Sequence, residues 1–203
     1  MRAEKSKHGI GYACQHIGLI MQYKQAMRRV ILSSIAVRPR PGNRQQGWLV
    51  AGPDRIPVAL GRGGIRANKR EGDGATPRGS FRLMRLWFRA DRSVRPATLL
   101  PIRPISLSDA WCEQAGDRRY NLPVRLSANQ IGDRLWRADN LYDLVIETNH
   151  NRRPRIAGRG SAIFIHVARP ALTPTAGCIG VPKCRLMILL RRLGAKTRLV
   201  VHL

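Results

Sequence analysis

Acidic residues are scarce in this sequence. Its 203 residues include only 12 Asp and Glu against 37 Lys and Arg, which gives a formal net charge of +25. Lysine is scarce too, since six of the 37 cationic residues are lysines and 31 are arginines. Such an excess of positive charge attracts polyanions. The partner could be nucleic acid or an anionic polymer such as a cell wall. The alternative, a compositional bias with arginines spread over solvated faces, stays open.

Other absences narrow the class of protein further. No run approaches about 18 consecutive apolar residues, so no transmembrane segment is expected. Four cysteines are too few for a disulfide scaffold. A zinc site built from Cys14 and His16, or from Cys178 and Cys184, has no CxxC pair to support it. We therefore expect no metal and no organic cofactor. A hydrophobic content of 43% excludes wholesale disorder.

The chain divides into a short extension and one folded domain. Residues 1–29 are polar and mixed, with a basic start and a weak apolar patch at 17–21 that is too short for a secretory signal. We interpret them as an uncertain N-terminal extension, either disordered or the product of a misassigned start, with Met27 as the alternative first residue. Residues 30–203 are expected to form a single domain, and we expect a monomer.

From residue 30 onward the pattern predicts a mainly β domain. A turn is expected at 43–47, and the glycines at 61–64 indicate another, since no GK[ST] follows them. Residues 89–137 are predicted to form a long loop-rich insertion, which Trp111 and Trp136 fix to the core. One short helix is predicted at 183–193. Apolar and β-branched runs predict strands at 30–37, 48–51, 56–60, 81–88, 142–147, 161–167 and 197–203.

His166 and Cys178 are the residues most suited to covalent chemistry. His166 lies near the end of a predicted strand, and Cys178 follows Gly177 a few residues before the predicted helix. A thiol is a good nucleophile only as the thiolate. A nearby imidazole and the positive end of the helix could favour that form. Gly177 leaves room for a carbonyl substrate, so backbone N–H groups at Gly177 and Cys178 could form an oxyanion hole. From spacing alone, a buried structural cysteine and a strand-end histidine remain the alternative.

Two motifs in this sequence resemble the YkuD (ErfK/YbiS) family of L,D-transpeptidases. Phe164-Ile165-His166 followed by Thr175-Ala176-Gly177-Cys178 is similar to the family's His…[S/T]-x-Gly-Cys signature. Residues 72–81, Gly-Asp-Gly-Ala-Thr-Pro-Arg-Gly-Ser-Phe, are similar to a stretch that the family carries upstream. Three features depart from the pattern: Ala176 replaces a frequent His, Gly180 replaces a frequent Asn or Arg, and the His-to-Cys interval is short. The dyad is retained, while the loop that would contact substrate is altered.

The resemblance implies a YkuD-like β-rich catalytic domain at residues 30–203, a sandwich or partly open barrel with one short packed helix. It implies a cysteine enzyme of the periplasm or cell envelope, although no clear signal peptide is visible. Cys178 would attack a peptidoglycan stem peptide, and His166 would act as general acid and base. A backbone carbonyl near Val167 is expected to hold the second imidazole nitrogen.

The same resemblance leaves the reaction partly open. Arg159, Arg169 and Thr175 flank the dyad and are candidates for binding substrate carboxylates. An amine acceptor would give 3,3 or 1,3 cross-links, whereas water would make the enzyme an L,D-carboxypeptidase. No specific nucleic acid is expected as a partner. A non-catalytic polyanion-binding or nucleic-acid-binding module remains the alternative from a different class.

Overall fold

The computed structural model describes residues 30–127, 130 and 132–203. The predicted N-terminal extension, residues 1–29, lies outside the described residues. So do the alternative start at Met27 and the zinc candidates Cys14 and His16.

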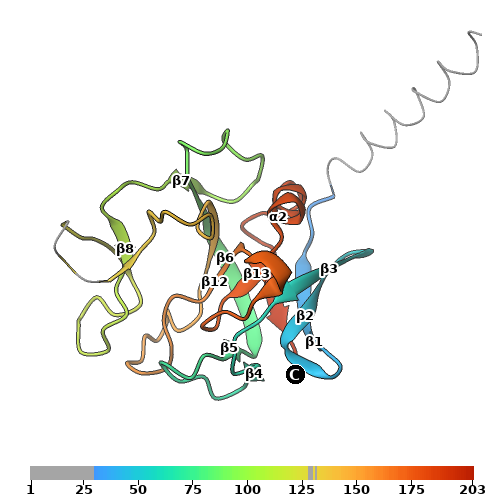
Figure 1. Cartoon of the computed structure of the whole chain (residues 1–203), viewed down its shortest axis with the longest axis horizontal. Helices are drawn as coiled ribbons and strands as arrows, with labels where there is room; N and C mark the ends of the chain where they lie inside the picture. Colours follow the sequence, from blue (N-terminus) through green and yellow to red (C-terminus); the bar gives the residue numbers. More distant parts are fainter. Residues whose placement is uncertain (1–29, 128–129, 131) are drawn as a thin grey trace, which may run out of the picture. The chain divides into compact units, whose positions relative to one another are not determined.

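The described residues form a mainly β structure with a single α-helix, as the sequence predicts (Figure 1). The α-helix, α2, covers Lys183–Leu190, and a short 3₁₀ helix, η1, covers Pro170–Leu172. The strands in chain order are β1 (Ser34–Arg40), β2 (Asn43–Ala51), β3 (Asp54–Ala59), β4 (Ile65–Arg66), β5 (Thr76–Pro77), β6 (Gly79–Phe88), β7 (Ile102–Pro104), β8 (Asp109–Trp111), β9 (Pro123–Arg125), β10 (Asp133–Arg134), β11 (Leu144–Thr148), β12 (Phe164–Val167), β13 (Ile179–Val181) and β14 (Arg198–Val201).

The main sheet closes on itself. Its strands follow the order β11, β12, β13, β3, β2, β1, β14, β6, and β6 also pairs with β11, so the two edges meet. β6 can make both contacts because it is ten residues long: residues 79–82 pair with β14, and residues 83–88 pair with β11. β7 extends the sheet from β6. Of the two architectures that the sequence left open, the structure is close to a barrel.

The first hairpin follows from alternating burial. Ile35 and Val37 of β1 are buried, and their neighbours face outward or are half-buried. The chain turns at Gly42, whose φ of 74° lies in the left-handed region that favours glycine. The predicted turn at 43–47 is wrong, because these residues begin β2 and pair with β1 and β3. Backbone pairing here outweighs a polar composition that by itself favours a turn.

The predicted helix is present but ends earlier than expected. α2 ends at Leu190, and the Arg191 N–H donates to the carbonyls of Ile188 and Leu189. Leu190 and Leu193 are nevertheless both fully buried, so the apolar face predicted from 3/4 spacing continues past the last helical turn.

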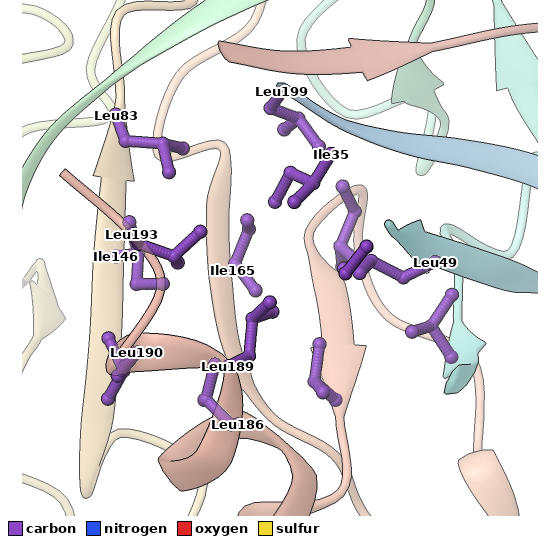
Figure 2. Packing of buried hydrophobic residues seen from close by; sticks show 14 of the residues in the cluster. Ile35, Leu49, Leu83, Ile146, Ile165, Leu186, Leu189, Leu190, Leu193 and Leu199 are labelled. Carbon is purple, nitrogen blue, oxygen red and sulfur yellow. The ribbon is translucent and has the colours of Figure 1, made fainter. Parts of the chain in front are cut away.

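Strands β11 and β12 are buried on both faces, as is the end of β6 at residues 86–88. Ile146 of β11 and Ile165 of β12 point into the interior of the closed sheet, where α2 packs against them (Figure 2). Val145 and Phe164, one residue earlier on the same strands, belong to a second apolar cluster on the outer face. Strands covered on both sides need apolar residues at successive positions. This explains the apolar runs at 86–88, 144–146 and 164–165.

The insertion at residues 89–137 covers that outer face. It contains more regular structure than predicted, because β8 pairs with β9 and β10 in a small separate sheet. Trp111 of β8 is 1% exposed, and its ring packs edge-on against Phe164 with centroids 4.9 Å apart. Trp136 packs on the same cluster, with the Arg89 guanidinium 3.7 Å from its ring centre. Both tryptophans therefore fix the insertion to the core, as predicted.

Truncating the inner face of α2 should destabilise the domain. Leu190→Ala removes a fully buried side chain, and we expect a loss of about 2–5 kcal/mol in the free energy of unfolding, measured by urea denaturation. Ile188→Ala on the same helix is the control, because Ile188 is 56% exposed. Its effect should stay within about 0.5 kcal/mol. Equal losses for both variants would contradict the packing of α2 described above.

Candidate active site

Cys178 lies at the start of a parallel strand pair. β12 and β13 pair with Ile165 opposite Ile179, and Cys178 immediately precedes β13. Its Sγ donates to the Ala162 carbonyl oxygen at 3.0 Å and accepts from the Phe164 N–H at 3.4 Å. The residue is 9% exposed. Two backbone groups from the segment entering β12 thus hold the buried sulfur.

His166 is held in one tautomer by its own strand. Its Nδ1 lies 2.8 Å from the Val167 carbonyl oxygen, the kind of contact that the sequence analysis anticipated. A carbonyl can only accept, so we assign the hydrogen to Nδ1 and the lone pair to Nε2. The imidazole is also buried. Nε2 is therefore the nitrogen that can take a proton.

Strand register brings Cys178 and His166 to the same face of the sheet. Cys178 lies beside Phe164 on the neighbouring strand, and His166 follows Phe164 by two residues, so the two are diagonal neighbours. Tyr142 packs edge-on against both rings of this face, 5.5 Å from His166 and 6.2 Å from Phe164 between centroids. Among the described residues no hydrogen bond joins thiol and imidazole, because the thiol donates to Ala162 instead.

The loop before Cys178 has little conformational freedom. The Thr175 hydroxyl donates to the Cys178 carbonyl at 2.6 Å and accepts from the Gly177 N–H at 3.1 Å. Gly177 has a φ of 140°, and a Cβ there would lie 2.8 Å from the Ala75 carbonyl oxygen. Only glycine fits this position without a shift. Of the two N–H groups considered for an oxyanion hole, the Gly177 N–H already donates to the Thr175 hydroxyl. The Cys178 N–H has no hydrogen-bond acceptor in the described part of the chain.

The upstream motif at residues 72–81 supports this same loop. The segment at 60–62 bridges the two: Thr175 exchanges backbone hydrogen bonds with Leu60 and Arg62, each 2.9 Å long. Next to them, the Gly61 N–H donates to the buried Thr76 hydroxyl at 2.9 Å. The two motifs are far apart in sequence but form one packed unit in the structure.

The two candidate arginines lie near opposite ends of β12. Arg159 precedes the strand, and its guanidinium donates to the Asn68 side chain at 2.5 Å. Arg169 follows the strand and lines a hollow of about 750 Å³ together with Leu141, Leu172 and Lys183. Cys178 and His166 do not line this hollow. Arg169 is thus beside the His166 end of β12, whereas Arg159 belongs to the loop that leads into it.

One protein family matches most of this chain. A family model for YkuD, the L,D-transpeptidase catalytic domain, matches residues 43–201, which is most of the chain. This chain belongs to the YkuD family. No curated protein and no solved structure matches it. The family match agrees with the mainly β, barrel-like fold.

The described part of this YkuD domain shows neither a cluster of metal ligands nor a membrane-spanning helix. Within residues 30–127, 130 and 132–203, no cluster of three or more His, Cys, Asp or Glu side chains is arranged to hold a metal ion. Across that same part of the chain, no helix has the length and apolar character needed to cross a membrane.

Burial keeps both members of the Cys178–His166 pair neutral at rest. Desolvation raises the pKa of the Cys178 thiol to about 12, and the negative charges of Asp133 and Glu113 act in the same direction. Desolvation also lowers the pKa of His166 to about 4. At neutral pH the resting YkuD domain therefore holds a thiol and a neutral imidazole rather than an ion pair.

The expectation that the following helix favours a thiolate is wrong. Cys178 precedes β13, whereas α2 begins at Lys183, after β13 has ended. The four residue steps of extended chain from Cys178 to Pro182 span about 13 Å at the usual strand rise. The field of a helix end fades within about one turn. The helix therefore packs the inner core without activating the sulfur.

The side chains whose charges act on the sulfur have no signature in the sequence and were not predicted. The Tyr142 hydroxyl donates to Asp133 Oδ2 at 3.1 Å, and burial raises the pKa values of both groups. Asp133 and Glu113 lie in the insertion, and their charges act on Cys178. No local pattern marks these residues, because only the docking of the insertion brings them to the dyad.

The buried, neutral state of Cys178 can be checked by alkylation. At pH 8, iodoacetamide should label Cys178 at least about tenfold more slowly than the exposed Cys184 of α2, since only accessible thiolates react quickly. Peptide-resolved mass spectrometry gives both rates in the same sample. In guanidinium chloride the two rates should converge. Equal rates in the native protein would show that the thiol is neither buried nor held neutral.

Proposed function

We propose that this chain is a cysteine-dependent peptidoglycan L,D-transpeptidase of the periplasm or cell envelope. Membership of the YkuD family supports the reaction class. The observation that carries the proposal is the shared face of β12 and β13, where the Cys178 sulfur lies diagonal to His166. The Val167 carbonyl accepts the hydrogen of His166 Nδ1, which leaves Nε2 to act as the base.

The first half-reaction forms an acyl-enzyme. Cys178 Sγ attacks the carbonyl carbon that follows an L-centre of the donor stem, and a C–S bond forms. The C–N bond to the terminal D-residue breaks. The thiol proton passes through His166 Nε2 to the leaving amine, so that protons balance. Because thiol and imidazole are both neutral at rest, proton transfer accompanies attack rather than preceding it. The Cys178 N–H is the donor suited to stabilise the oxyanion.

The second half-reaction transfers the acyl group to an amine. The acceptor nitrogen attacks the thioester carbon, a C–N bond forms and the C–S bond breaks. One proton of the amine returns through His166 to the sulfur. If water replaces the amine, the product is a shortened stem, and the enzyme acts as an L,D-carboxypeptidase. Both outcomes use the same residues, and the acceptor amine decides between 3,3 and 1,3 cross-links.

The hollow beside Arg169 is a suitable place for part of a second stem peptide. Its walls include apolar side chains such as Leu141 and Leu172, with Arg169 and Lys183 among its lining residues. Stem peptides carry carboxylates, which a guanidinium binds with two parallel hydrogen bonds. The position next to the end of β12 puts such a stem on the His166 side, where the proton of an attacking amine is removed.

The net charge of +25 agrees with a substrate that is an anionic polymer. It also agrees with the alternative, a basic module that binds polyanions without catalysis. Salt dependence separates the two, because non-specific nucleic-acid binding weakens steeply as salt rises and would be unaffected by Cys178→Ala.

Replacing either member of the dyad should abolish the reaction. With disaccharide-tetrapeptide as substrate, Cys178→Ala and His166→Ala should each show no acyl-enzyme, cross-linking or hydrolysis by mass spectrometry. A carbapenem should add covalently to Cys178 in the wild type and not in Cys178→Ala. Cys184→Ala is the matched control and should keep full activity, since Cys184 lies exposed on α2. Unchanged turnover in Cys178→Ala would end the proposal.

Gly177 tests the loop that carries the nucleophile. Gly177→Ala forces a Cβ against the Ala75 carbonyl, so the loop must shift, and we expect turnover to fall about 10²-fold. Gly158→Ala is the control, because Gly158 also has a positive φ, 75°, but a Cβ there meets nothing within 4 Å. It should lose some stability and keep turnover within about twofold. Equal turnover in both variants would contradict the tight fit of the loop.

A further inference from the structure

Asn121 forms hydrogen bonds through all of its side-chain polar groups, although it lies in the turn between β8 and β9, away from the motifs. Its Nδ2 donates to the carbonyls of His150 and Asn151, both at 2.9 Å. Its Oδ1 accepts from Trp111 Nε1 at 3.0 Å and from the Ala162 N–H at 3.1 Å. The residue is 2% exposed. An amide side chain has two donors and an acceptor with two lone pairs, so no capacity is left.

Ala162 connects this amide to the sulfur. Its N–H donates to Asn121, and its carbonyl accepts the Cys178 thiol at 3.0 Å. Ala162 has a φ of 50°, which is unfavourable for a residue with a Cβ. Such a conformation persists only where the surroundings hold it. The hydrogen bond that the Ala162 N–H donates to Asn121 Oδ1 holds Ala162 in this orientation.

We propose that Asn121 is a positioning residue for Cys178, acting through the backbone of Ala162. This inference rests on the proposed role of Cys178 as nucleophile. Asn121 holds residue Ala162 in its left-handed conformation, and that conformation points the Ala162 carbonyl at Cys178 Sγ. The carbonyl and the Phe164 N–H together select one position of the sulfur. The insertion therefore contributes to the chemistry without touching substrate.

The hydrogen bond to Ala162 also makes the thiol less acidic. A carbonyl that accepts from the S–H stabilises the neutral form, so its loss should lower the pKa of Cys178. The other titratable groups that act on the sulfur are Asp133 and Glu113 of the insertion, Tyr142, and Lys69 in the loop before the upstream motif, and His166 lies diagonal to it on β12. None of these side chains is hydrogen-bonded to Asn121.

Asn121→Ala should separate positioning from general reactivity. Without the anchor, Ala162 relaxes and the sulfur samples several positions. The midpoint of the pH profile for iodoacetamide labelling of Cys178 should fall by about one unit or more. The kcat for donor turnover should fall at least about tenfold, with KM within about twofold. Loss of stability alone could also expose the thiol, so the control is a variant that loses buried hydrogen bonds elsewhere in the fold.

Thr197→Ala is the matched control. Thr197 is also a buried polar residue that holds backbone groups: its hydroxyl accepts from the Gly194 N–H at 3.0 Å and donates to the Leu32 carbonyl at 2.7 Å. Neither partner belongs to the segment around Ala162. We expect the labelling midpoint and kcat of Thr197→Ala to match those of the wild type. Equal shifts in both variants would overturn the inference, as would an unshifted midpoint and kcat in Asn121→Ala.

Ala162→Val tests the last link even if Asn121→Ala does not fold. A β-branched residue is disfavoured more strongly than alanine at a φ of 50°, so residue 162 should leave its conformation, and the midpoint and kcat should shift in the same directions as in Asn121→Ala. Ala162→Gly, which adopts this φ at little cost, should keep wild-type values. Unchanged values in Ala162→Val would overturn the role of Ala162. The labelling profile needs no turnover, so it tests the inference even if Cys178→Ala retained activity and the proposed function failed.

Discussion

β12 is buried on both of its faces, and the arrangement of the site depends on this constraint. Its inner residues, such as Ile165, pack against α2 inside the closed sheet, and its outer residues, such as Phe164, pack under Trp111 of the insertion. A strand enclosed in this way has little freedom to shift. Cys178 and His166 take their positions from its parallel pairing with β13 and from its alternation of faces.

The same burial determines the chemistry of the dyad. Removal from water destabilises both the thiolate and the imidazolium, so the resting pair is neutral. The thiol donates to a backbone carbonyl, and the imidazole is oriented by another. This state protects the sulfur from indiscriminate reaction. Under the proposed function, a substrate carbonyl must arrive before the proton moves, so activation would depend on substrate.

Much of the fold and the candidate residues of the site could be predicted from the sequence. Alternating and continuous apolar runs indicated most strands of the closed sheet but not β13, whose three residues are too few to show a pattern. The pattern around His166 and Cys178 indicated the candidate dyad. The turn expected at 43–47 failed because backbone pairing with two neighbouring strands outweighs local composition. The helix expected to activate Cys178 failed because strand β13 separates the two by its full length. Both errors concern where segments lie relative to each other.

The sequence by itself determined the candidate reacting groups, the glycine beside the sulfur and the mainly β character of the domain. These depend on residue type and on periodicities of a few residues, which are local properties. Only the tertiary structure decided the surroundings of the sulfur: the Ala162 carbonyl, the anchor at Asn121, and the charges of Asp133 and Glu113. Asn121, Asp133 and Glu113 come from an insertion with no local signature, and Ala162 lies in the loop before β12. They meet the dyad because aromatic packing on Phe164 brings together segments that are distant along the chain.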